Sequence, residues 1–306
     1  MKYKLPIVFF LAFINCFSQP FSKIWKDLNY AGDSLVYHRL DIYLPKIEKQ
    51  NYPVIISIYG SAWLANNAKN ADQNTLVKYL LEAGFAVVTP NHRSSKDAIF
   101  PAQINDIKAA IRFVRANASQ YQIDTSFVGI TGSSSGGSLA AIAGTSRFVK
   151  QYTLGKVTVD IEGTVGNYLS HGSSVDAVVD WFGPTNMLVM DSCGTTKMIH
   201  NAANSPASLY VGGPIQENKE LTLLASPTTF IDPIDPPFLI LHGDKDPVVP
   251  YCQSEILFND LQKANVQSQF VSVPNGGHGP GVHVEKYLTM MNDFFLIELE
   301  KSKAKK

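Results

Sequence analysis

The chain has no excess of charge of either sign: its 306 residues include 26 Lys and Arg and 26 Asp and Glu. Proteins that bind nucleic acid carry a basic surface, so this balance argues against a nucleic-acid partner. No basic helix is evident either, which argues against binding to an anionic membrane surface. Neither a C-x-x-C nor an H-E-x-x-H pattern occurs, so the sequence predicts no metal site and shows no need for a cofactor.

Long hydrophobic runs are also lacking, and the one near the start of the chain is short. Lys2 and Lys4 precede an apolar run over residues 5–14, which is too short to span a bilayer. Small residues follow at 16 and 18, so the pattern predicts a secretory signal peptide over residues 1–18 and an exported protein, periplasmic or secreted. A lipoprotein with Cys16 as the lipidated residue is less favoured, because asparagine precedes Cys16 where a small residue is usual. We expect no other segment to contact a membrane.

Cysteine is scarce, with three in the whole chain, and removal of the signal peptide leaves Cys193 and Cys252. Two cysteines in an exported protein can pair in an oxidising compartment. The alternative is a pair of unbonded, buried thiols. Export favours the disulfide, and the alternative stays open because a sequence does not give the distance between the two residues.

Apolar runs alternate with helical patterns along the chain. Alternating apolar and polar residues predict a half-buried strand at 36–44. The apolar runs predict strands at 53–59, 85–90, 127–130, 175–182, 238–241 and 267–273, and the helical patterns cover 74–83, 101–118 and 282–298. Nearly continuous apolar strands are typical of a parallel sheet covered on both faces. The order therefore predicts an α/β protein, with a mostly parallel sheet flanked by helices in a single domain over residues 19–306. Residues 185–237 lack a strong strand pattern and contain several prolines, so we expect a cap-like insertion there.

A G-x-S-x-G pentapeptide, Gly132–Gly136, lies between the strand at 127–130 and a helix of small residues. In such a turn the central serine occupies a strained apex with its hydroxyl exposed, and the start of the helix favours a developing negative charge. Ser134 is therefore a candidate nucleophile for acyl transfer. Ser133 and Ser135 do not fit the register of the pattern.

A serine hydroxyl needs a base, and in this strand–turn–helix setting an acid and a histidine are expected later in the chain, in that order. Asp246 follows the strand at 238–241, and His278 follows the strand that ends at residue 273. Both would lie at the carboxyl edge of the sheet, where active-site groups of open α/β sheets collect. We predict Ser134 as nucleophile, His278 as general base and then acid, and Asp246 as the group that orients the imidazole.

Three neighbouring residues are weighed against these assignments. Asp244 is an alternative acid, but it stands nearer the strand end, where it can fix the turn. His283 is an alternative base, but the pattern from residue 282 onward predicts a helix. His242 is expected to close the strand end in a structural role.

The tetrahedral intermediate of acyl transfer requires backbone N–H donors for its oxyanion. One donor is expected at Ser135, immediately after the nucleophile. The other is expected at Ser61 or Ala62, in the loop after the strand at 53–59. Trp63 in the same loop is predicted to line the substrate pocket, and a core aromatic is an equally open interpretation.

Several segments together carry a resemblance to a known family. They are Tyr59–Trp63, residues 91–95, residues 100–103 with Asp106, Gly132–Gly136, residues 235–250 and residues 277–279. The chain resembles the α/β-hydrolases, near the hormone-sensitive lipase group, and in particular bacterial carbohydrate esterases of the feruloyl and acetyl-xylan esterase type. This resemblance implies the α/β-hydrolase fold and ester hydrolysis.

The chain departs from the family pattern at two places. The oxyanion loop, His-Gly-Gly in the family, is Tyr59-Gly60-Ser61 here, and Ser61 narrows the pocket without removing a backbone donor. Residues 91–93 read Asn-His-Arg in place of Asn-Tyr-Arg, which is interpreted as structural variation.

The expected function is that of an exported serine esterase that removes acetyl or feruloyl-type groups from carbohydrate esters. Its substrate would be a small-molecule or oligosaccharide ester. The alternatives are a generic short-chain esterase or lipase, a serine peptidase of the prolyl-oligopeptidase type, and a non-catalytic binding protein that kept the hydrolase fold. The altered loop at residues 59–61 is what keeps the last alternative open.

Overall fold

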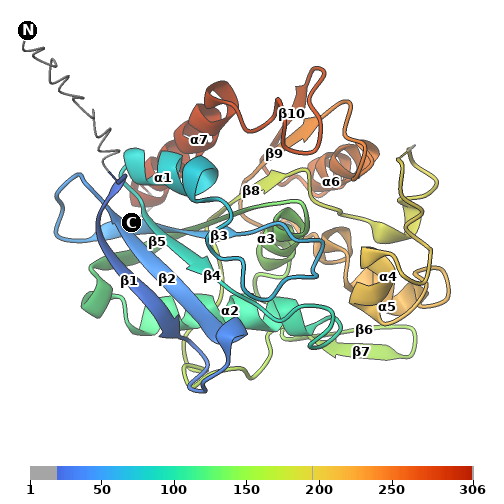
Figure 1. Ribbon diagram of the computed structural model, residues 1–306, viewed down its shortest axis with the longest axis horizontal. Helices are drawn as coiled ribbons and strands as arrows, with labels where there is room; N and C mark the ends of the chain where they lie inside the picture. Colours follow the sequence, from blue (N-terminus) through green and yellow to red (C-terminus); the bar gives the residue numbers. More distant parts are fainter. Residues whose placement is uncertain (1–18, 195, 305–306) are drawn as a thin grey trace, which may run out of the picture.

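The computed structural model describes residues 19–194 and 196–304, so the predicted signal peptide lies outside the described residues. Eight strands of this part form one sheet, in the order β1-β2-β4-β3-β5-β8-β9-β10 (Figure 1). The first two strands run antiparallel to their neighbours, and all other pairings are parallel. The strands are β1 (Phe21–Asn29), β2 (Arg39–Pro45), β3 (Tyr52–Ile58), β4 (Ala86–Pro90), β5 (Ile123–Ser133), β8 (Ala177–Trp181), β9 (Phe238–Gly243) and β10 (Ser268–Val273). The predicted mostly parallel sheet is thereby confirmed.

Helices cover both faces of this sheet. They are α1 (Lys78–Glu82), α2 (Ala102–Ala116), α3 (Ser135–Thr145), α4 (Pro206–Val211), α5 (Lys219–Leu224), α6 (Cys252–Lys263) and α7 (Glu285–Ala304). Alternate residues of a strand point to opposite faces. In β3, Val54 and Ile56 therefore pack in the core under α2, α3 and α6, whereas Ile55 packs in the core under α1 and α7. With both faces buried, the central strands must be apolar throughout, as their sequences are.

The structure corrects three expectations about single elements and adds elements that the sequence did not predict. A two-stranded hairpin of β6 (Gln151–Leu154) and β7 (Val157–Asp160), and helix α6, were not predicted. The strand expected at 36–44 starts with a short 3-10 turn and lies buried rather than half-buried. The helix expected at 74–83 begins as a π-helical turn over Gln73–Val77. The helix expected from residue 282 begins at Glu285.

The segment at 185–237 has the character expected of an insertion. Its described residues form α4, α5 and two 3-10 turns, Met187–Val189 and Pro227–Phe230, and contain no strand. The segment lies beyond β8 and brings side chains to the carboxyl edge of the sheet, as described below. None of the helices that the structure describes combines the length and apolarity needed to cross a membrane.

Candidate active site

The turn at Ser134 holds its serine in a rarely populated backbone conformation. Strand β5 ends at Ser133, α3 begins at Ser135, and Ser134 between them has φ 56° and ψ −124°. Non-glycine residues seldom adopt positive φ, and such strain collects at functional sites. The turn is held because the Ser134 N–H donates to the Trp181 carbonyl of β8 at 2.8 Å.

The two flanking glycines are required by close backbone approach. A Cβ at Gly132 would contact the Gly136 carbonyl oxygen, and a Cβ at Gly136 would contact the Ile58 carbonyl oxygen of β3. The small residues therefore let α3 start directly against the ends of β3 and β5. This is the physical reason for the G-x-S-x-G pattern at this position of the chain.

The structure brings together all three residues of the predicted triad. Ser134 Oγ lies 2.9 Å from His278 Nε2, and His278 Nδ1 lies 2.7 Å from Asp246 Oδ2. Asp246 follows β9 and His278 follows β10, so neighbouring parallel strands deliver both to the same edge of the sheet. Phe182 packs against the His278 ring with centroids 4.7 Å apart.

Asp246 is held as a carboxylate by several donors. Its Oδ1 accepts hydrogen bonds from the backbone N–H of Val248 at 2.7 Å and of Val249 at 3.0 Å. Burial raises the pKa of Asp246, but its hydrogen bonds with His242 and His278 outweigh burial and hold the pKa well below its usual range. The ionised oxygen is thus available to orient the imidazole.

The competing residues have other partners. Asp244 accepts a hydrogen bond from Asn275 N at 2.7 Å, which fixes the turn between β9 and the His278 loop. His242 bonds Ser254 Oγ at 2.7 Å through Nδ1, and its Nε2 lies 3.3 Å from Asp246 Oδ2. His242 is therefore structural, as expected, and it also supports the acid.

His283 lies in the loop before α7, not in the helix, which corrects the reason given for setting it aside. Its Nε2 is 3.2 Å from Ser133 Oγ, and its ring packs against Trp181 and Phe182. Burial and the nearby charge of His278 lower the pKa of His283 to about 4. His283 is a second histidine beside the turn, and it contacts Ser133 rather than Ser134.

A small cavity of about 40 Å³ opens beside Ser134. Its wall is almost wholly apolar and is formed by Ala62, Trp63, Ser134, Ser135, Pro184, Met190, Met198, His200, Pro206, Ala207, Val248 and Val249. Five of these residues, from Met190 to Ala207, come from the insertion and were not predicted. Their only sequence signal is their place in a segment without strands, between the nucleophile and the acid.

Trp63 serves both interpretations that the sequence left open. It is 2% exposed and belongs to the hydrophobic core, and it also lines the cavity. Its ring stacks on Tyr210 of α4, with centroids 4.3 Å apart and planes 7° from parallel. The tryptophan thereby joins the loop after β3 to the insertion.

The three predicted oxyanion donors differ in their placement. Ala62 and Ser135 line the cavity, whereas the Ser61 N–H donates to the Ser135 hydroxyl at 2.9 Å. Ala62 has φ 54°, so the loop bends sharply where it reaches the cavity. Ala62 and Ser135 thus border the cavity, and Ser61 fixes the loop to the first turn of α3.

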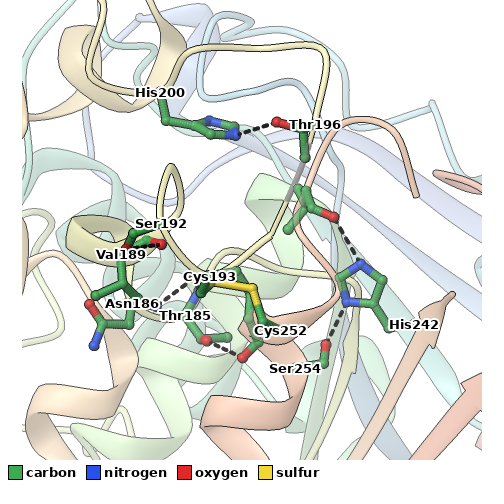
Figure 2. Close-up of a disulfide and its surroundings, with 12 residues drawn as sticks. Thr185, Asn186, Val189, Ser192, Cys193, Thr196, His200, His242, Cys252 and Ser254 are labelled. Atoms are coloured by element: carbon green, nitrogen blue, oxygen red, sulfur yellow. Dashed lines mark hydrogen bonds between the residues drawn. A yellow bond between two sulfur atoms is a disulfide. The ribbon is translucent and has the colours of Figure 1, made fainter. Parts of the chain in front are cut away.

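Cys193 and Cys252 are joined by a disulfide in the structure (Figure 2). Cys193 belongs to the insertion, and Cys252 is the first residue of α6. Among the residues that the structure describes, no group of three His, Cys, Asp or Glu side chains is placed to hold a metal ion.

Comparison with known proteins assigns the chain to a family. Residues 40–261 match the BD-FAE family. The chain belongs to the BD-FAE family. The matched range runs from β2 to α6 and contains Ser134 and Asp246, while His278 lies beyond it. The resemblance to α/β-hydrolases near the hormone-sensitive lipase group is confirmed.

Relatives of this BD-FAE chain are named esterases. Esterase LipQ of Mycobacterium tuberculosis is 30% identical over 227 residues, which are 74% of this chain and 50% of LipQ. The chain spans about half the length of the curated relatives it matches.

Two solved structures are more similar still. A truncated form of a carbohydrate esterase from gut microbiota is 53% identical, with a TM-score of 0.88 over 92% of this chain and 97% of that chain. A bifunctional GH43-CE protein of Bacteroides eggerthii is also 53% identical, with a TM-score of 0.86 over 90% of this chain and 35% of that one.

Proposed function

We propose that this protein is an exported serine esterase that removes acetyl or feruloyl-type groups from carbohydrate esters. The observation that carries the proposal is the continuous hydrogen-bond chain from Ser134 through His278 to Asp246. The carbohydrate part is supported by the carbohydrate esterase that shares 53% of its sequence with this chain. Export is supported by the signal-peptide pattern of the sequence.

The chemistry follows from the order of these contacts. Ser134 Oγ attacks the acyl carbonyl carbon while His278 Nε2 takes the hydroxyl proton. The oxyanion that forms is bound by the N–H groups of Ala62 and Ser135. The protonated His278, stabilised by Asp246, gives its proton to the departing sugar oxygen, which leaves as an alcohol. A water then attacks the acyl-enzyme with His278 as base, releases the carboxylic acid and restores Ser134.

The cavity indicates how an ester would be oriented. Its wall is apolar, and of the two parts of a carbohydrate ester only the acyl group is apolar, because the sugar carries hydroxyls. We therefore place a small acyl group such as acetyl in the cavity and the sugar toward solvent. The size of the cavity favours acetyl over the larger feruloyl group.

The test compares hydrolysis of p-nitrophenyl acetate, methyl ferulate and an acetylated xylo-oligosaccharide. Ser134→Ala should reduce turnover of every ester that the wild type accepts by about 10⁴-fold or more. The matched control is Ser133→Ala, which removes the adjacent hydroxyl and should leave turnover measurable. Equal losses in both variants would place the nucleophile elsewhere.

The pattern of substrates separates the alternatives. Turnover of p-nitrophenyl acetate, but not of methyl ferulate or of the acetylated xylo-oligosaccharide, would favour a generic short-chain esterase, to which the small cavity is suited. A folded wild type that hydrolyses none of the three would favour a non-catalytic binding protein, in line with the Ser61 N–H that is bonded to Ser135.

A further inference from the structure

We propose that the Cys193–Cys252 disulfide fixes the insertion-side wall of the cavity and thereby limits the size of the acyl group that the site accepts. We call residues 190–194 and 196–200 the cavity wall segment, because Met190, Met198 and His200 line the cavity from it. The inference rests on the proposed function, since it concerns the selectivity of the same site. It assigns the disulfide a mechanical role and no redox chemistry.

The wall segment is anchored at one end of α6 and not in the sheet. Cys193 is bonded to Cys252, the first residue of α6, and Gln253 Nε2 donates to Cys193 Sγ at 3.4 Å. Gln253 Oε1 also accepts the backbone N–H groups of Thr185 at 2.9 Å and Asn186 at 2.7 Å. The first turn of α6 therefore holds both the start of the insertion and the wall segment (Figure 2).

The same turn supports the acid of the triad. Ser254, two residues after Cys252, bonds His242, and His242 lies against Asp246. Figure 2 shows the disulfide with the His242–Ser254 contact beside it, at the same end of α6. Consecutive residues of α6 thus position the cavity wall and the catalytic acid relative to one another.

Among the residues that the structure describes, the other hydrogen bonds of the wall segment are few. At one end, the His200 carbonyl accepts the hydroxyls of Ser205 and Ser208. Asp191 accepts the backbone N–H groups of His200 at 2.7 Å and Asn201 at 2.8 Å, which closes the segment on itself. One backbone hydrogen bond, from Lys197 N to the Pro247 carbonyl at 3.2 Å, links it to the loop after Asp246. The disulfide is the covalent link that holds the segment against α6, so its loss should free the wall more than any single hydrogen bond would.

Movement of the wall segment would change the cavity because of the side chains that it carries. Met190 and Met198 are unbranched and adaptable, so the cavity of about 40 Å³ that they line keeps its size only while their backbone is held in place. A cavity of about 40 Å³ is small, so it suits a short acyl group such as acetyl better than a longer chain. A displaced wall would admit a longer acyl chain.

The experiment measures kcat/KM for p-nitrophenyl acetate and p-nitrophenyl butyrate in three proteins. They are the oxidised wild type, the wild type reduced with a phosphine, and the Cys193→Ala/Cys252→Ala double variant. We expect the butyrate-to-acetate ratio to rise about ten-fold in the last two, the lower end of what one methylene is worth in a hydrophobic pocket. Turnover of acetate should persist, because the contacts of Ser134 and His278 do not involve the disulfide.

Ser192→Ala is the matched control. Its hydroxyl bonds the Val189 carbonyl within its own turn, one residue before Cys193. This variant should keep the wild-type ratio. An unchanged ratio in a folded double variant, or the same change in Ser192→Ala, would overturn the proposal.

A second measurement does not depend on activity. Hydrogen exchange followed by mass spectrometry should rise in residues 190–200 on reduction and stay constant in β5 and α3. If the wild type hydrolyses neither ester, the proposed function fails while the exchange result still decides whether the disulfide holds the wall. If reduction instead unfolds the whole protein, or leaves exchange at 190–200 unchanged, the disulfide does not act on the wall specifically and the inference is wrong.

Discussion

At the scale of single residues, two nearby carboxylates of the site, Asp246 and Asp244, differ in their hydrogen-bond partners. Asp246 contacts His278 at 2.7 Å and accepts two backbone N–H groups, whereas Asp244 accepts one N–H in an exposed turn. Only Asp246 can fix the tautomer of His278 and stabilise its cation. Substitution of each by asparagine, which preserves shape and removes charge, tests this difference.

Asp246→Asn should lower kcat/KM by about 10³- to 10⁴-fold, because an amide beside Nδ1 favours the wrong imidazole tautomer. Asp244→Asn should change it by less than ten-fold. The assay belongs well below the melting temperature, since the depressed pKa of Asp246 means that its carboxylate stabilises the fold above about pH 4. Comparable losses in the two variants would show that Asp244 takes part in orienting the imidazole.

At the scale of elements, the nucleophile depends on how closely α3 approaches β3. A Cβ at Gly136 would lie 2.6 Å from the Tyr59 carbonyl oxygen, and nearer still to that of Ile58. Both neighbours are backbone atoms, which cannot move aside as a flexible side chain can. The turn therefore tolerates no side chain at this position without displacing the helix from the strand.

Gly136→Ala should lower the free energy of unfolding by about 2 kcal/mol or more, as overpacking does, and should abolish hydrolysis. Gly172→Ala is the control, because its Cβ would meet nothing nearer than Ser174 Oγ at 4.0 Å. The control should stay within about 0.5 kcal/mol of the wild type in urea unfolding. Wild-type stability in Gly136→Ala would contradict the close approach.

The elements that could be predicted from the sequence are those in which burial requires a recognisable run of apolar residues. β3, β4 and β9 are covered on both faces, so their apolar runs can be recognised without structural information. The β6–β7 hairpin is mostly exposed and therefore has no such run. Helix α6 buries Leu257 and Leu261 but also polar residues at 253 and 254, which bond the insertion and His242, so its apolar stripe is interrupted.

The candidate site likewise has one part that could be predicted from the sequence and one part that could not. Ser134, Asp246 and His278 were predictable because each follows a recognisable strand and the chain order is fixed by the fold. Trp63 was also predicted to line the pocket. The insertion side of the cavity was not predictable, because Met190, Met198 and His200 reach the cavity from a segment without periodicity. Its path is set by long-range contacts, among them the disulfide and the Trp63–Tyr210 stack, which no local pattern encodes.

At the scale of the whole molecule, buried carboxyl groups make opposite contributions to the dependence of stability on pH. Burial raises the pKa of Asp180 to about 7, against the effect of one hydrogen bond from Gly183 N at 3.0 Å. Its Oδ2 is buried and has no hydrogen-bond partner among the residues that the structure describes. Asp246, whose pKa is held low, acts in the opposite sense. A substitution of Asp180 alone can therefore show how much this residue contributes to the dependence of stability on pH.

The sign of the contribution that Asp180 makes to the pH dependence of stability follows from proton linkage. Between the usual pKa of an aspartate, about 4, and about 7, the folded protein keeps a proton on Asp180 that the unfolded chain has released. Stability contributed by this group therefore falls as the pH rises through that window and levels off above it. Asparagine has the shape of the protonated form, and its carbonyl can accept the same Gly183 N–H.

Asp180→Asn should consequently make the unfolding free energy depend less steeply on pH. Between pH 5 and pH 8 the wild type should lose about 2–3 kcal/mol more of its unfolding free energy than the variant, at about 1.4 kcal/mol per pH unit up to pH 7. Urea unfolding of both proteins at the two pH values measures this difference directly. Because each protein is compared with itself, the effects of Asp246 and of the other titrating groups cancel. Parallel losses in the two proteins would mean that Asp180 is already ionised at pH 5 and that its burial is offset by solvent.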